Sequence, residues 1–449
     1  MLFTTEQVAQ LAPDAASLKS GKDLARASKW LSLGDSGRAI WGELQGSGKD
    51  PYRTTVDTQS TAFKCSCPSR KFPCKHGLGL LFVLIQSEAN VPKGATEPAW
   101  VQEWMDKRQE KAEKTANPSP ENEPDEKTIE QRARDKAKRA AARAESTQAA
   151  AAEMETFLKD LLRGGFLALP TKNAATFGTL AARMVDNKAP GLATFARNFQ
   201  KINYFQGNGW HSEALENAAQ AWLLLDALRH RDVLPSLVQQ DLNNLLWPQK
   251  REELFADPAA ETIEDEWLVL AKTVETEDDL RTHKHWLWGC KTGRSALILD
   301  FSYKSAPIQT LLVPGMAIEA TLVFYPSNWP FRAVVKTQGK DQTEAQTKPI
   351  ALENWSLAQR EQAENLARYP WIDDWPQFVS GISLATEQQQ WFLQDQEHDV
   401  LPLNPDFKEN QIWHFLALTG GQPSDLFVLR TGKTVLPIGF LEKGVYHIL

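Results

Sequence analysis

The sequence predicts a multidomain α+β protein, and three observations support this fold class. Three of the four cysteines lie close to a histidine within residues 65–76. Residues 154–254 have the apolar spacing of helices, and from about residue 262 the apolar residues alternate as they do in strands. We therefore expect a small cysteine-containing unit near the N-terminus, an all-helical middle domain and a β-rich C-terminal region.

Residues 1–104 are expected to form an N-terminal α+β domain. Residues 1–34 are expected to be helical, and they precede two predicted strands, 39–44 and 52–57, which a glycine-containing turn connects. A third strand over 62–67 leads into the cysteine cluster, and an apolar helix over 77–86 follows it. Strands followed by a helix predict a small ββα-type finger at about residues 52–88.

The cysteines and the histidine have the spacing of metal ligands. Cys65 and Cys67 are two residues apart, so on a strand both side chains point to the same face, and Cys74 and His76 have the same separation. Three thiolates and one imidazole form a closed tetrahedral set, typical of one structural Zn²⁺, with no position for a catalytic water. Buried reduced thiols or a disulfide would also fit the spacing. The clustering favours a metal, because Cys290 alone lies outside it.

The order Cys-x-Cys, loop, Cys-x-His resembles the SWIM zinc finger, and the segment CSCPSRKFPCKH is similar to bacterial stand-alone SWIM proteins. The resemblance implies a β-hairpin carrying the first two cysteines, a helix after the histidine, and the zinc ligands Cys65, Cys67, Cys74 and His76. It also implies DNA or protein binding, and a role as adaptor of an AAA ATPase or a VWA-domain protein. A looser resemblance extends over most of the chain.

The finger is the basic part of an acidic chain. The net charge is -7, and the basic residues Lys64, Arg70, Lys71 and Lys75 lie in or beside the metal loop, with no acidic residue between positions 64 and 76. These side chains are candidates for contacts with nucleic-acid phosphates. They would equally offset the charge of a zinc ion with three thiolates. The acidic remainder of the chain favours a protein partner.

Residues 105–153 are expected to form a charged, alanine-rich linker, either a solvated helix or a partly disordered tether. Its basic side chains could contact nucleic acid, although a plain spacer is the commoner meaning of such a segment. Residues 154–254 then predict a compact antiparallel helical domain with short loops.

The C-terminal region is expected to contain an antiparallel β domain, 255–345, and an α+β domain, 346–449. The second of these would contain a helix at 356–368 and several strands, among them 413–418. His283, His285 and Cys290 suggest a second metal site, but no fourth ligand lies nearby in the sequence, so packing within strands is the preferred interpretation.

The sequence therefore predicts a non-enzymatic zinc-binding interaction protein. The alternative is an enzyme with an unrecognised active site in residues 255–449, although no known catalytic motif occurs there. The N-terminus has no signal-peptide pattern, and the longest apolar run, around residues 78–85, is too short to cross a bilayer. We expect no membrane partner and a cytoplasmic location, where thiols stay reduced.

Overall fold

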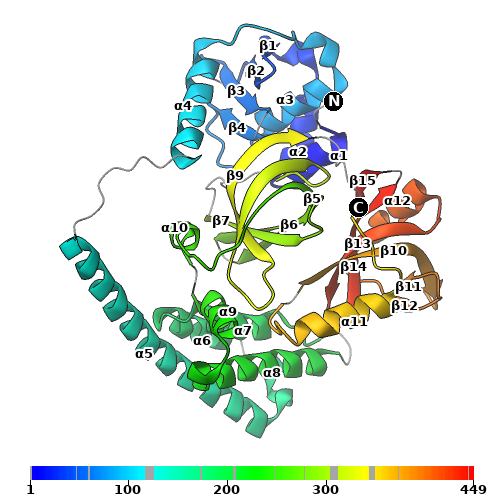
Figure 1. Ribbon diagram of the computed structural model, residues 1–449. Helices are drawn as coiled ribbons and strands as arrows, with labels where there is room; N and C mark the ends of the chain where they lie inside the picture. The colour runs from blue at the N-terminus through cyan, green and yellow to red at the C-terminus, as the bar shows by residue number, and fades with distance from the viewer. Residues whose placement is uncertain are drawn as a thin grey trace.

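The computed structural model describes residues 3–46, 48–58, 61–116, 126–171, 174–205, 209–247, 249–277, 279–303, 312–342, 349–372, 374–442 and 444–449. Within these ranges the chain is a mixed α+β structure with three β-sheets, one of which closes into a barrel. Figure 1 shows the N-terminal sheet at one end, the helical bundle at the other, and the barrel beside the C-terminal sheet between them. The predicted fold class is thereby confirmed.

The N-terminal part is a four-stranded antiparallel sheet with helices on both faces. The strands lie in the order β1 (Ser32–Asp35), β2 (Ala39–Leu44), β3 (Tyr52–Asp57) and β4 (Ala62–Cys65). One face packs on α1 (Thr5–Leu11), α2 (Ala15–Asp23) and α3 (Lys75–Gln86), while α4 (Ala99–Ala116) covers the other. Strand β1 falls where a helical pattern had been expected, so that part of the prediction was wrong.

The helical bundle contains α5 (Glu126–Gly164), α6 (Ala174–Asp186), α7 (Pro190–Lys201), α8 (Trp210–Arg229), α9 (Ser236–Leu246) and the short α10 (Arg251–Phe255). Its core is built from the apolar faces of α5 to α9. Ala150 and Met154, both on α5, are fully buried in this core. The core of the bundle therefore includes residues before position 154, where the sequence had placed the start of the helical domain.

The barrel consists of β5 (Thr262–Glu277), β6 (Leu280–Gly289), β7 (Ser295–Tyr303), β8 (Ala317–Phe324) and β9 (Arg332–Gln342). The strand order is β5-β6-β7-β9-β8, and the pairing between β7 and β9 that closes it is parallel. The other pairs of the barrel are antiparallel. Closure depends on a contact between non-consecutive strands, which local patterns do not reveal.

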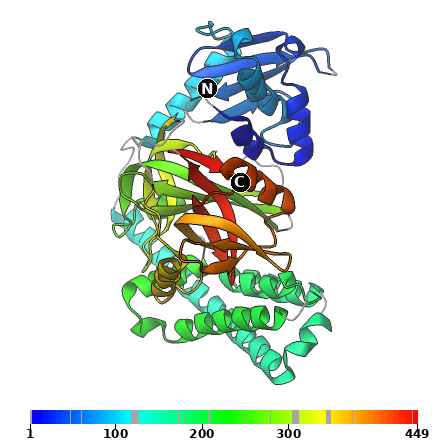
Figure 2. The same cartoon turned by 90° about the vertical axis from the view of Figure 1, so that its right-hand side faces the viewer.

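The C-terminal part is a six-stranded sheet with helices on one face. It comprises α11 (Trp355–Leu366), β10 (Asp374–Glu387), β11 (Gln390–Gln394), β12 (Val400–Pro402), α12 (Glu409–Thr419), β13 (Ser424–Thr431), β14 (Thr434–Glu442) and β15 (Val445–Ile448). The strand order is β12-β11-β10-β13-β14-β15. The other face packs on the outside of the barrel, as Figure 2 also shows.

The predicted strand 413–418 is wrong, because these residues belong to α12. Ile412 and Phe415 are buried three residues apart, while Trp413 is 57% exposed. This is the spacing of one helical face, and a short apolar run does not distinguish a helix from a strand.

The parts of the chain are held together by direct contacts. Val313 and Met316, in the segment before β8, belong to the core of the N-terminal part. Asp241 of the bundle accepts a hydrogen bond from the backbone of Asn328 at 3.1 Å, which joins α9 to the loop between β8 and β9. Among the described helices, none is both long and apolar enough to cross a membrane.

Candidate metal centre

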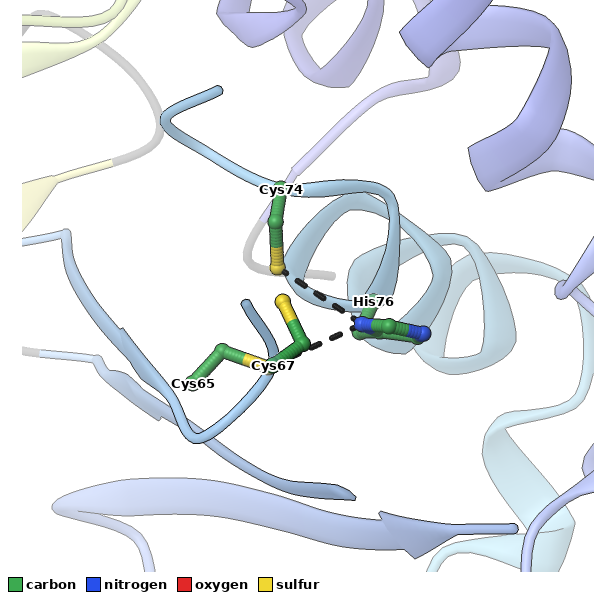
Figure 3. Close-up of side chains that lie close together, drawn as sticks. All are labelled: Cys65, Cys67, Cys74 and His76. Atoms are coloured by element: carbon green, nitrogen blue, oxygen red, sulfur yellow. Dashed lines mark hydrogen bonds between the residues drawn. The ribbon is translucent and has the colours of Figure 1, made fainter. Parts of the chain in front are cut away.

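Four side chains from the end of β4 and the start of α3 converge near the surface of the N-terminal part (Figure 3). Cys65 is the last residue of β4, and Cys67 lies two residues beyond it. Cys74 is the N-cap of α3, and His76 lies in the first turn of that helix. Cys67 was expected to lie within the strand, but β4 ends at Cys65, so the chain beyond the strand brings its thiol to the cluster.

The distances within the cluster fit a tetrahedral metal site. The ligand atoms of the four residues all lie within 4.8 Å of one another. Cys65 Sγ lies 3.7 Å from His76 Nδ1, and Cys74 Sγ lies 3.9 Å from the same nitrogen. Zinc bonds of about 2.3 Å to sulfur and about 2.0 Å to nitrogen place such atoms about 3.5 Å apart in a tetrahedron. The donors fit one Zn²⁺ after small movements, with His76 binding through Nδ1.

Neighbouring side chains fix the ligands in position. Thr54 Oγ1 lies 3.2 Å from Cys65 Sγ, and the ring centroid of Tyr52 lies 4.9 Å from that of His76. A Cβ atom on Gly77 would lie 2.8 Å from the ring of Phe63, so only glycine allows α3 to begin this close to β4. The spacing of the cysteines contained no signal for these supporting residues.

The four side chains of the cluster strongly shift one another's pKa values. Hydrogen bonds from Cys65 and Cys74 hold the pKa of the Cys67 thiol well below its usual range. Hydrogen bonds with Cys65 and Cys67, together with burial, raise the pKa of the Cys74 thiol. Burial lowers the pKa of His76, but hydrogen bonds to Cys65 and Cys67 outweigh it and raise that pKa to about 9. The metal-free cluster therefore retains protons that a bound Zn²⁺ would displace.

The comparison with known families supports the same site. Residues 52–85 match the family model of the SWIM zinc finger, and this range contains all four ligands. The chain carries a SWIM zinc finger.

A match to a second family model also points to a SWIM family protein. Residues 142–246 match the SWIM-associated four-helix bundle domain, which corresponds to the region from α5 to α9. No curated protein and no solved structure matches the chain. Cys65, Cys67, Cys74 and His76 are thus positioned to bind one structural zinc ion, and neither of the matched modules is a catalytic domain.

The basic residues of the SWIM finger do not form one uniform group. Lys64, Arg70, Lys71 and Lys75 are all exposed. Lys71 Nζ lies 2.8 Å from a carboxylate oxygen of Asp14, the residue that caps α2. Among the described residues, no carboxylate forms an ion pair with the other three. The sequence did not indicate the contact between Lys71 and Asp14.

The SWIM cluster is the one group of histidine, cysteine and acidic ligands that lies close enough for a metal within the described ranges. His283 and His285 point into the barrel, where His283 Nε2 lies 3.1 Å from Ser302 Oγ. Cys290 is buried between the barrel and the C-terminal sheet. The second metal site that the sequence had suggested is therefore not assembled by these three residues.

Proposed function

We propose that this SWIM protein is a zinc-dependent binding protein and not an enzyme. The closed Cys₃His set supports this proposal, because four protein ligands leave no coordination position for a substrate or a reactive water. The zinc stabilises the small N-terminal sheet, whose strands β3 and β4 lead directly to the ligands. The chain then acts through its surfaces.

The preferred partner is a protein, specifically an AAA ATPase or a VWA-domain protein for which the chain is an adaptor. The charge distribution supports a protein partner, because the net charge of -7 repels polyanions from most of the surface. The test is binding of the zinc-loaded chain to the AAA ATPase and the VWA-domain protein of its own source, measured by calorimetry. Binding that is lost after zinc removal supports the proposal, and equal binding with and without zinc contradicts it.

Nucleic acid is the second candidate partner. The exposed side chains of Lys64, Arg70 and Lys75 favour it, since none of them is engaged in an ion pair within the described parts of the chain. Three phosphate contacts would give a log–log slope of affinity against salt of about -3 on duplex DNA.

The experiment measures DNA binding by the full chain across a salt series. The combined variant Lys64→Glu, Arg70→Glu, Lys75→Glu should lose binding, whereas Lys433→Glu, in an exposed turn far along the chain, should not. Equal effects of the two variants, or no binding at low salt, would exclude the finger as a nucleic-acid site.

A further inference from the structure

Arg430 on β13 carries a buried charge for which the described chain offers no counter-ion. The residue is only 8% exposed, and its Nε and Nη1 atoms are sealed from solvent without a hydrogen-bond acceptor. Burial lowers the pKa of Arg430, with no opposing effect of an acid. Arginine is rarely buried unless it is paired, because an uncompensated charge in the interior is strongly destabilising.

A second buried donor comes from the residue that is paired with Arg430 on the neighbouring strand. Trp375 on β10 is opposite Arg430 in the register of the sheet, so the two side chains lie on the same face. Trp375 is 2% exposed, and its buried indole Nε1 has no hydrogen-bond partner among the residues that the structure describes. Its ring stacks on that of Trp329 with 4.4 Å between centroids, which fixes its orientation. Two buried donors on neighbouring strands thus lack an acceptor within the described parts of the chain.

Two described acidic residues near this part of the sheet, one on β10 and one on α11, do not pair with Arg430. Asp374 accepts hydrogen bonds from Lys284 at 2.9 Å and from Thr431 at 3.1 Å. Glu361 of α11 lies against Gln377, and burial raises its pKa, which is opposite to the effect of a neighbouring guanidinium. An ordered water would satisfy the hydrogen bonds of Arg430 but would not balance its charge.

We propose that Arg430 and Trp375 form a binding site for a small oxyanion, the phosphate or carboxylate group of a ligand. One anion would accept hydrogen bonds from both residues and neutralise the guanidinium. The planar fork of an arginine matches the oxygens of these two groups, and such charge-assisted bonds are the strongest hydrogen bonds in proteins. The site lies on the C-terminal sheet, remote in sequence from the zinc ligands and independent of the proposed partner of the finger.

The experiment uses the zinc-loaded full-length chain and follows thermal unfolding during titration with inorganic phosphate or with acetate, at constant ionic strength. At least one of the two anions should raise the unfolding midpoint of the wild-type chain, because a ligand that binds the folded state alone stabilises it. Stabilisation by phosphate only, or by acetate only, identifies the group that the site recognises. If neither anion shifts the midpoint, the proposal is overturned.

Arg430→Met should weaken the apparent affinity for the anion by about tenfold or more, as expected for loss of a charge-assisted pair. Without anion, this variant should be at least as stable as the wild type, since it removes an uncompensated charge. Arg360→Met, on an exposed helix face, is the control and should bind normally. Equal anion binding by Arg430→Met and the wild type would overturn the proposal, as would marked instability of Arg430→Met without anion.

Trp375→Phe provides a milder test that keeps the aromatic ring and removes only the indole donor. Its affinity for the anion should fall by a few fold, since one neutral hydrogen bond is lost. Unchanged affinity in this variant would remove Trp375 from the site and overturn the two-residue proposal.

Discussion

Lys71, in the loop between the two pairs of zinc ligands, lies 2.8 Å from the carboxylate of Asp14 at the start of α2. Asp14 also accepts a hydrogen bond from the backbone of Ser17 at 2.7 Å, which caps that helix. The contact joins the metal loop to the helices that precede the sheet. One of the four basic residues of the finger thus has a structural role inside the N-terminal part.

Asp14→Ala should destabilise the N-terminal part by about 1 kcal/mol, the usual cost of losing a helix cap. Lys71→Ala should cost less, about 0–1 kcal/mol, because the ion pair is solvent-exposed. Urea unfolding measures both, with Lys75→Ala as the control that should have almost no effect. A larger effect of Lys75→Ala than of Lys71→Ala would contradict the role given to this pair.

The same pair predicts a pH dependence. The hydrogen bond from Lys71, with that from Ser17, lowers the pKa of Asp14 to about 2. A carboxyl group with a depressed pKa in the folded state stabilises it above its ordinary pKa near 4. This contribution should disappear as the pH falls from about 4 towards 2. Asp14→Asn should show a smaller loss of stability over that range, and an identical loss would contradict the prediction.

Cys67→Ser and His76→Ala should each abolish zinc binding and unfold the N-terminal sheet, since a finger of this size depends on its metal for folding. We expect residues 154–449 to stay folded, because the bundle, barrel and C-terminal sheet have their own cores. Limited proteolysis with mass spectrometry would locate the unfolded part. Loss of the whole fold would contradict the proposed domain division.

Cys290→Ala is the control for these ligand variants. Cys290 is buried between the barrel and the C-terminal sheet, remote from the SWIM cluster. Its substitution should leave the zinc content at one per chain. A reduced zinc content in this variant would mean that the ligand set is wrong.

The ligands could be predicted from the sequence because their geometry is local. Cys65 and Cys67, and likewise Cys74 and His76, are separated by one residue, and a helix pattern follows. The supporting contacts were not predictable, because Thr54 and Tyr52 reach the site through the pairing of β3 with β4. The partner of Lys71 lies more than fifty residues away, and no spacing rule connects the two.

The elements of the fold were likewise predictable where the signal is local, and contacts between distant segments were not. Helices of the bundle and most barrel strands were found from periodicity, since each has one buried face. Closure of the barrel could not be predicted from periodicity, because it depends on the parallel pairing of Leu297 and Ile298 with β9. The strand predicted at 413–418 was wrong because its apolar residues were assigned to a strand. Trp413 and Leu418 are instead partly exposed on helix α12.

Acid should destabilise the barrel through its two inward-facing histidines. Burial, with the charge of Lys272, lowers the pKa of His283 to about 4 and holds that of His285 well below its usual range. A histidine with a depressed folded-state pKa favours unfolding once the pH falls below about 6.5, where the unfolded chain takes up the proton. The stability loss is at most about 1.4 kcal/mol per pH unit for each histidine.

His285→Leu should reduce this acid sensitivity, measured by urea unfolding at pH 7.5 and pH 5. Neither ring nitrogen of His285 has a hydrogen-bond partner among the described residues, so an apolar residue should be tolerated at neutral pH. His414→Gln, at an exposed position on α12, should behave as the wild type. An unchanged pH dependence in His285→Leu would show that His285 is not the sensitive group.

The most decisive measurement is X-ray absorption at the zinc edge of the purified full-length chain, combined with the metal content. A closed structural site predicts one zinc per chain with three sulfur ligands at about 2.3 Å and one nitrogen at about 2.0 Å. No oxygen ligand from water should be present. A chain that purifies without zinc, or a zinc ion that keeps a water in its first coordination sphere, would contradict the closed Cys65, Cys67, Cys74 and His76 site and the non-enzymatic function proposed from it.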